Sequence, residues 1–117
     1  MEALEKVKIA VKALDSKRGE NIQVIKVTDL TIIADYFVIA SGTSSTQVKA
    51  LADETEYKLT ESGVEPNHIE GRTSNWICLD YSDVIVHVFH KEQRDFFQLE
   101  RLWEDGESVD ISPFIAE

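Results

Sequence analysis

Cysteine is almost absent from this sequence of 117 residues. The one cysteine, Cys78, has no second thiol with which to form a disulfide inside the chain, and a cysteine-based zinc site is excluded for the same reason. Proline is also scarce, and neither Pro66 nor Pro113 interrupts a periodic segment. No repeat or low-complexity stretch occurs. We therefore expect a single domain over residues 1–105, followed by a C-terminal tail over residues 106–117.

Long apolar runs are missing as well. No stretch reaches the ~18 consecutive apolar residues of a membrane-spanning helix. The N-terminal segment MEALEKVKIAVKAL carries charges inside its apolar pattern, whereas a secretory signal needs an uninterrupted apolar block. These features predict a cytoplasmic protein that has no membrane partner.

Basic residues are few compared with acidic residues. Lysine and arginine total 12 against 22 aspartates and glutamates, which gives a net charge of −10. A chain this acidic is repelled by phosphate backbones, so direct sequence-specific binding of nucleic acid is not expected. A basic protein surface is a more natural partner because opposite fields speed encounter. The alternative is that the acids only keep the protein soluble.

Hydrophobic periodicity predicts elements in the order α-β-β-α-β-β-β-α. The first helix carries an apolar stripe and can end at Gly19: Ala3, Leu4, Val7, Ala10, Val11 and Leu14. A second helix runs between Ser44, which has capping-box spacing to Gln47, and Gly63. Short apolar runs predict strands at residues 22–27, 36–40, 68–70, 76–81 and 84–89. A last helix begins at Glu92 and carries Phe96, Leu99 and Trp103.

This order predicts the mixed α/β or α+β class, with one mixed sheet of about five strands flanked by helices. The run YFVIA at residues 36–40 is continuously apolar, as expected of a strand buried on both faces. In the tail, Val109, Ile111 and Phe114 are the residues that would fold back onto the domain.

The segment TSNWICLDYSDVIVHVFH, residues 73–90, predicts a β-hairpin around Tyr81 and Ser82. A two-residue loop at that point fixes these cross-strand pairs: Trp76 with His87, Cys78 with Ile85, and Asp80 with Asp83. Like charges directly opposite each other destabilise a sheet. The facing acids therefore suggest a basic partner at this end of the hairpin, although solvent and turn geometry could also relieve the repulsion.

The two faces of the hairpin differ in composition. One is aliphatic and predicts core: Ile77, Leu79, Val84, Val86 and Val88. The other is mixed: Trp76, Cys78, Asp80, Asp83, Ile85, His87 and Phe89. A tryptophan anchor rimmed by polar groups is typical of binding hot spots. If a helix covered this face instead, Trp76 would be plain core and His87 a hydrogen-bonded core histidine. The pattern alone leaves both alternatives open.

Catalytic and metal sites are not expected. His87 and His90 are three apart, which on a strand directs them to opposite faces. Residues 41–45, SGTSS, lie between a strand and a helix, as in the phosphate-binding opening of nucleotidyltransferases. That chemistry needs two acids spaced two apart on a later strand, whereas Asp80 and Asp83 are three apart. We therefore expect no enzyme and no cofactor, and helix capping is the favoured role of residues 41–45.

Several motifs together resemble the ribosomal silencing factor family, also called RsfS or Iojap-like. The resemblance covers about residues 7–105. It is carried by DYFVIASGTS at residues 35–44, Gln47-Val48, Glu70-Gly71, Trp76, LDYSDVIVHVF at residues 79–89, Arg94, Leu99-Glu100 and Leu102-Trp103. Two positions depart from the family pattern: Ser82 replaces a usual glycine, and Cys78 replaces a usual aliphatic residue.

The resemblance implies both a fold and a function. The fold is nucleotidyltransferase-like but lacks the catalytic acids. Members of the family bind the fourteenth protein of the large ribosomal subunit, block association with the small subunit and so repress translation. Carried over to this chain, the binding residues are Glu70, Trp76, Asp80, Tyr81, Asp83, His87 and Phe89. The alternatives are a homo-oligomeric module, such as a homodimer, and a cryptic nucleotide-binding protein.

Overall fold

The computed structural model describes residues 1–28, 34–71, 75–92 and 107–115. In chain order the elements are α1 (Ala3–Ser16), β1 (Glu20–Lys26), β2 (Tyr36–Gly42), α2 (Ser45–Glu61), β3 (His68–Glu70), β4 (Trp76–Asp80), β5 (Val84–His90), β6 (Glu107–Val109) and α5 (Ser112–Ile115). The predicted order is confirmed as far as β5. The predicted last helix, with Phe96, Leu99 and Trp103, extends over residues 93–106, which lie outside the described residues, as do Arg94, Glu100 and Leu102.

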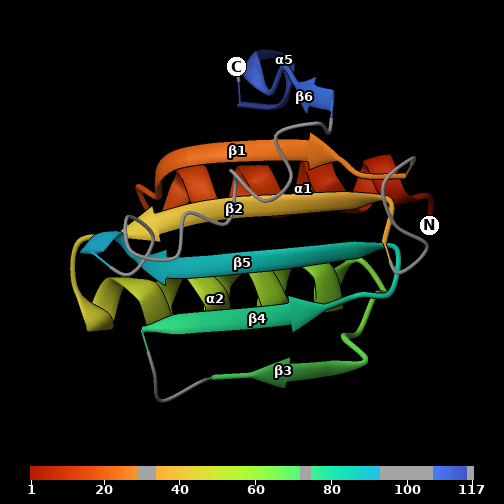
Figure 1. Ribbon diagram of the computed structural model, residues 1–117. Helices are drawn as coiled ribbons and strands as arrows, with labels where there is room; N and C mark the ends of the chain where they lie inside the picture. Colours follow the sequence, from red (N-terminus) through yellow and green to blue (C-terminus); the bar gives the residue numbers. More distant parts are fainter. Residues whose placement is uncertain (29–33, 72–74, 93–106, 116–117) are drawn as a thin grey trace.

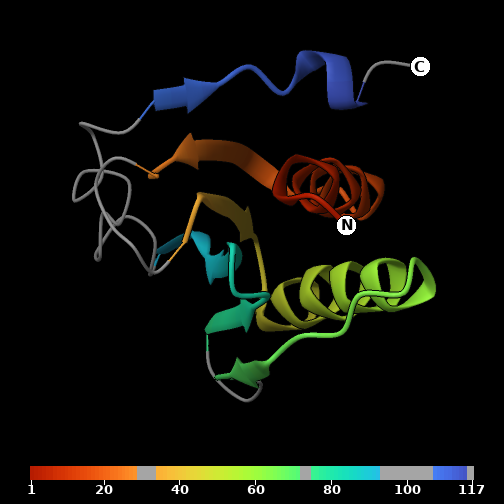
Figure 2. The same cartoon turned by 90° about the vertical axis from the view of Figure 1, so that its right-hand side faces the viewer.

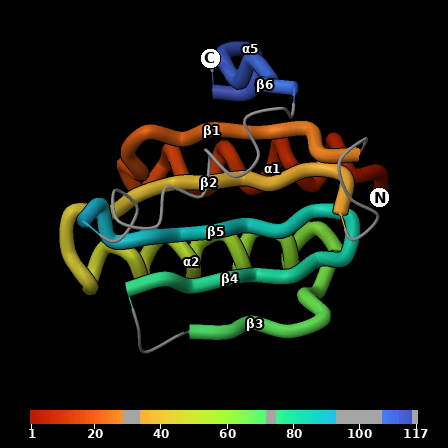
Figure 3. The backbone as a smooth tube through the Cα atoms, in the orientation of Figure 1, coloured from red at the N-terminus to blue at the C-terminus, as the bar shows by residue number. Residues whose placement is uncertain are grey.

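The described strands form one mixed sheet in the order β3-β4-β5-β2-β1-β6 (Figures 1 and 3). The central pair, β2 and β5, is parallel, and every other neighbouring pair is antiparallel. The mixed α/β class is thereby confirmed. The sheet has six strands where about five were predicted, because Glu107–Val109 pairs with β1 at one edge. The division into a domain at residues 1–105 and a tail at residues 106–117 stays a prediction.

Both long helices pack on the same face of the sheet (Figure 2). Their buried side chains join the inward-facing residues of the central strands in one hydrophobic cluster that includes Val7, Leu14, Leu51 and Leu59. The predicted stripe of α1 is buried except at its N-terminal end, where Leu4 is exposed. No helix in the described part of the chain combines the length and hydropathy needed to cross a membrane.

The two helices end in the same way. Gly63, after α2, has a φ of +89°, and the amide of Val64 donates to the carbonyl of Leu59 at 2.8 Å. The helix thus ends at Gly63, as predicted, and it does so through a left-handed residue. After α1 the left-handed residue is Arg18, with a φ of 63°, and not the predicted Gly19. Gly19 instead permits close approach, since a Cβ there would lie 3.2 Å from a methyl group of Leu51.

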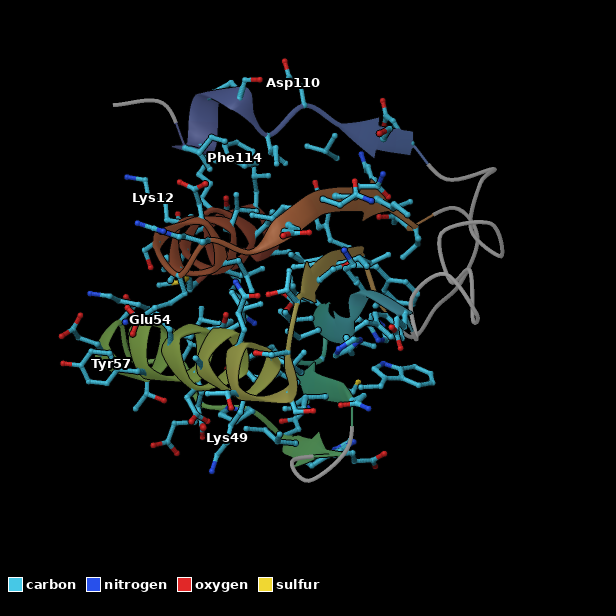
Figure 4. All side chains as sticks on the ribbon, turned by 90° about the vertical axis from the view of Figure 1, so that its left-hand side faces the viewer. Lys12, Lys49, Glu54, Tyr57, Asp110 and Phe114 are labelled. Atoms are coloured by element: carbon cyan, nitrogen blue, oxygen red, sulfur yellow. The ribbon has the colours of Figure 1, made fainter. Side chains whose placement is uncertain are left out.

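The C-terminal segment folds back as predicted for Val109, Ile111 and Phe114, which pack against the helix-side core. Figure 4 shows Phe114 of α5 directed toward α1. The Nζ atom of Lys8 lies 5.7 Å from the centre of the Phe114 ring, a cation–π distance. Strand β6 and helix α5 therefore close one edge of the sheet and one side of α1.

Strand β2 is buried on both faces, as its continuous apolar run predicted. Its even-numbered residues Val38 and Ala40 belong to the helix-side core. Phe37 and Ile39 face the other way and belong to a second cluster with Ile25, Val27, Ala34 and Phe89. The sheet therefore has a helix-covered face and a second apolar face, and the mixed side of the hairpin belongs to the second.

Candidate protein-interaction surface

The β4–β5 hairpin forms, but its register differs from the predicted one by two residues. Trp76 pairs with Phe89, Cys78 with His87, and Asp80 with Ile85. The predicted opposition of Asp80 and Asp83 is therefore wrong, because Asp80 faces an uncharged residue across the hairpin. A shift of two residues leaves every paired side chain on its own face, so the distinction between the two faces survives.

The turn explains the difference in register. The amide of Tyr81 donates to the carbonyl of Val84 at 2.9 Å, so Ser82 and Asp83 form the tip. Ser82 has a φ of +73°, a left-handed conformation that favours glycine. The Oδ1 atom of Asp80 accepts a hydrogen bond from the Ser82 amide at 2.8 Å, and the Asn67 side chain contacts the Ser82 hydroxyl. These contacts hold a serine in a strained conformation.

Asp83 is held by the chain itself. Its Oδ1 atom accepts a hydrogen bond from Nζ of Lys6, on α1, at 2.7 Å. The Lys6 side chain is 14% exposed and that of Asp83 is 32% exposed, so the pair is only partly in contact with solvent. Asp83 thus ties the hairpin tip to the first helix and does not lie on the mixed face as predicted.

Tyr81 also belongs to the helix side. It is buried in the same core cluster as the aliphatic face of the hairpin. That face is core, as predicted, in all five of its members: Ile77, Leu79, Val84, Val86 and Val88. Tyr81 and Trp76 therefore lie on opposite faces of the sheet, and in this conformation the Tyr81 side chain offers no surface to a partner.

Four rings meet on the other face and are called the aromatic cluster below: Phe37, Trp76, His87 and Phe89. The Trp76 indole stacks on Phe89 with 4.9 Å between ring centres, and Phe37 and His87 form a T-shaped contact with 5.1 Å between ring centres. His87 and Phe89 are buried, whereas Trp76 is half-buried. Both sequence alternatives are thus partly right, because Trp76 reaches the surface while His87 is a core histidine with a hydrogen bond.

That hydrogen bond joins Nε1 of Trp76 to Nδ1 of His87 at 3.2 Å. Burial lowers the pKa of His87 from 6.5 to about 4, so the imidazole is neutral at neutral pH. Because Nδ1 accepts from the indole, the proton must lie on Nε2. Nε2 is buried and finds no hydrogen-bond partner within the described part of the chain.

Acidic side chains rim the aromatic cluster on β3 and β4. The His68 Nε2 atom lies 3.3 Å from Oε1 of Glu70 and 3.6 Å from Oδ2 of Asp80. Burial, and then the charges of Asp80 and Glu70, raise the pKa of the Cys78 thiol to about 11. Glu70 and Asp80 therefore place two carboxylates at the rim, on either side of the His68 ring nitrogen.

The seven predicted binding residues fall into three groups. Glu70 and Asp80 lie on the rim, and Trp76, His87 and Phe89 form most of the aromatic cluster. Tyr81 and Asp83 lie on the helix side, in the core and in an ion pair.

Sequence reasoning missed Lys6, Phe37 and His68 as members of these networks. Of these, only Phe37 could have been identified from the sequence, because neighbouring residues of a buried strand, here Phe37 and Val38, point to opposite faces of the sheet.

Residues 41–45 lead from the end of β2 into the start of α2, and Thr43, Ser44 and Ser45 form hydrogen bonds within the chain. The Ser44 hydroxyl caps α2 by accepting a hydrogen bond from the amide of Gln47 at 3.1 Å, as the capping-box spacing predicted. The amide of Thr43 donates to Oε1 of Gln47 at 2.6 Å, and Gln47 Nε2 donates to the carbonyl oxygen of Arg18 at 3.0 Å. Among the described residues, no three His, Cys, Asp or Glu side chains converge as metal ligands do.

The chain is similar to known proteins over nearly its whole length. A family model described as "Ribosomal silencing factor during starvation" matches residues 1–117. The ribosomal silencing factor RsfS of Bacillus subtilis is 40% identical over 90% of both chains. A crystal structure of a protein from Chromobacterium violaceum is 37% identical, with a TM-score of 0.87 over 94% of this chain and 92% of that one.

A more distant relative is the "mitochondrial assembly of ribosomal large subunit protein 1" of Mus musculus. It is 32% identical over 83% of this chain, which spans 44% of that protein. The matches to the family model, to the Bacillus subtilis relative and to the crystal structure all run through the hairpin that carries the aromatic cluster. This chain belongs to the RsfS family of ribosomal silencing factors.

Proposed function

We propose that this protein binds the large ribosomal subunit through its fourteenth protein and sterically blocks association with the small subunit, thereby repressing translation. It acts in the cytoplasm, by binding and not by catalysis. The observation that carries the proposal is the surface made by Trp76, half-buried and stacked on Phe89, with the carboxylates of Glu70 and Asp80 at its rim.

The chemistry of this surface suits a basic protein partner. Trp76 supplies apolar area at the centre, where truncation of a hot-spot tryptophan typically costs ~2 kcal/mol or more. Glu70 and Asp80 pair with lysine or arginine at the rim and act mainly on the association rate. The net charge of −10 adds long-range attraction to a basic surface. Family membership, and the mouse relative named for assembly of the ribosomal large subunit, support the choice of partner.

The other predicted residues support this surface from inside the protein. His87 and Phe89 underlie Trp76 as buried members of the aromatic cluster. Tyr81 anchors the hairpin in the helix-side core, and Asp83 ties its tip to Lys6. Changing Phe89, Tyr81 or Asp83 affects binding through the shape of the hairpin.

Size alone is sufficient for occlusion. The protein extends 33 × 32 × 30 Å, so a copy bound where the small subunit docks holds that subunit tens of ångströms away from the site. Direct contacts between macromolecules need heavy atoms within about 4 Å. No chemical step is required for silencing by this route.

Binding of purified large subunits by wild type, Trp76→Ala and Tyr57→Ala tests the proposal. Tyr57 is a matched control, because it is an aromatic residue that is 57% exposed on the outer side of α2, on the helix-covered side of the molecule (Figure 4). We expect Trp76→Ala to weaken binding about thirtyfold or more and Tyr57→Ala to bind as wild type does. A folded Trp76→Ala protein with full affinity would show that the partner binds elsewhere.

A further inference from the structure

The aromatic cluster contains a buried histidine whose role the proposed function leaves open. His87 is 7% exposed, so little of its ring is available to a partner, yet it accepts a hydrogen bond from the more exposed Trp76. We propose that His87 is a positioning residue: it holds the Trp76 indole in the orientation that the partner recognises and does not itself touch the partner. This inference rests on the proposed function.

Among the described residues, a ring contact and a hydrogen bond act on the orientation of the indole. Stacking on Phe89, at 4.9 Å with 24° between the ring planes, fixes the plane of the indole. Stacking alone leaves two orientations open, because a half-turn about the Cβ–Cγ bond keeps the ring plane and exchanges the two edges of the indole. The hydrogen bond from Nε1 to Nδ1 of His87, at 3.2 Å, removes this freedom by directing one edge of the indole at the imidazole.

The imidazole can do this only as an acceptor. Nδ1 is the acceptor in the tautomer that carries its proton on Nε2, and Nε2 is buried without a partner in the described part of the chain. Leaving a buried N–H unpaired is unfavourable. In this arrangement that cost accompanies the hydrogen bond that Nδ1 accepts from Trp76. A phenylalanine would fill the same space but could not accept, whereas the Oδ1 atom of an asparagine could accept from a position close to that of Nδ1.

A fixed indole favours binding in two ways. A side chain that is already ordered loses less rotamer entropy when a partner docks, which is worth about three- to tenfold in affinity. The indole N–H is already satisfied by His87, so the partner needs no acceptor opposite that edge. We therefore infer that the partner places an apolar or flat group against Trp76, such as the stem or guanidinium plane of an arginine.

The test measures affinity for large subunits in a double-mutant cycle: wild type, His87→Phe, Trp76→Ala and the double variant. We expect His87→Phe to lose about three- to tenfold in affinity, and to lose nothing further when Trp76 is already alanine. His87→Asn separates orientation from packing. If His87 positions the indole, the His87→Asn variant should bind more tightly than His87→Phe. If His87 only fills space, His87→Phe should bind more tightly than His87→Asn. The indole ¹H–¹⁵N resonance of Trp76, read in folded variants, reports the hydrogen bond directly.

Four outcomes would overturn the inference. Full affinity in folded His87→Phe, or an equal loss with and without Trp76, would show that His87 does not act through the indole. Better binding by Phe than by Asn would make it a packing residue. If wild type itself fails to bind large subunits, the proposed function falls and this inference with it. That result is distinguishable because it appears before any variant is made.

Discussion

Protonation of His87 should destabilise the fold between neutral and mildly acidic pH. Burial lowers the pKa of His87 from 6.5 to about 4 in the folded chain, while the unfolded chain titrates near the ordinary value. Between these two pH values the unfolded state binds more protons than the folded state. The free energy of unfolding therefore falls as the pH drops through this window and is fully present above it.

The size of the effect follows from the two pKa values. Because proton binding is linked to folding, the free energy of unfolding should fall by about 2 kcal/mol between pH 7 and pH 5, and by about 3 kcal/mol in all once the pH is below 4. Part of the penalty is structural, because a protonated Nδ1 can no longer accept the hydrogen bond from Trp76. The change should therefore also alter the environment of the indole.

Urea unfolding at pH 7 and pH 5 measures this contribution when wild type is compared with His87→Phe. Other groups titrate in both proteins, so the quantity of interest is the difference between their pH dependences. We expect wild type to lose about 2 kcal/mol more than the variant over this interval. Equal losses in the two proteins would show that His87 is not buried in neutral form, and the geometry of the aromatic cluster would then be wrong.

Two further perturbations test the surroundings of the hairpin. Lys6→Met and Asp83→Asn should each destabilise the fold by about 1 kcal/mol, because the ion pair is only partly exposed. The double variant, measured by urea unfolding, should show a coupling energy of similar size. Additive effects of the two changes would contradict the ion pair. Cys78, with its pKa raised from 9.0 to about 11, should react with iodoacetamide at pH 8 about a hundredfold more slowly than a thiol of ordinary pKa. A rate equal to that of a free thiol would mean that the Cys78 thiol is neither buried nor close to the charges of Asp80 and Glu70.

Periodicity was sufficient to predict the layers of the fold. Apolar residues recur at helical spacing in both α1 and α2, and this spacing predicted the two helices. The folded protein buries those same helix faces. The alternation along residues 76–89 likewise predicted which hairpin residues face the helices. A strand has only two sides, so assigning faces needs no knowledge of what lies opposite.

Register and long-range pairing could not be predicted in the same way. The register depends on Ser82 adopting a φ of +73°, which a serine disfavours and which only its contacts with Asp80 and Asn67 make possible. The partner of Asp83 is Lys6, which lies 77 positions earlier in the chain. Lys6 lies outside the apolar stripe of α1, so the sequence gives no reason to expect it to contact the sheet. Strand β6 escaped prediction because three residues are too short to show a period.

Inhibition of subunit joining is the step by which this protein is proposed to act, and a sedimentation assay measures it. Large subunits are incubated with this protein before small subunits are added, and assembled ribosomes are quantified by sedimentation. We expect wild type to reduce joining in proportion to its occupancy of the large subunit, and Trp76→Ala to reduce it only at about thirtyfold higher concentration. Normal joining on large subunits saturated with wild-type protein would contradict silencing by steric exclusion.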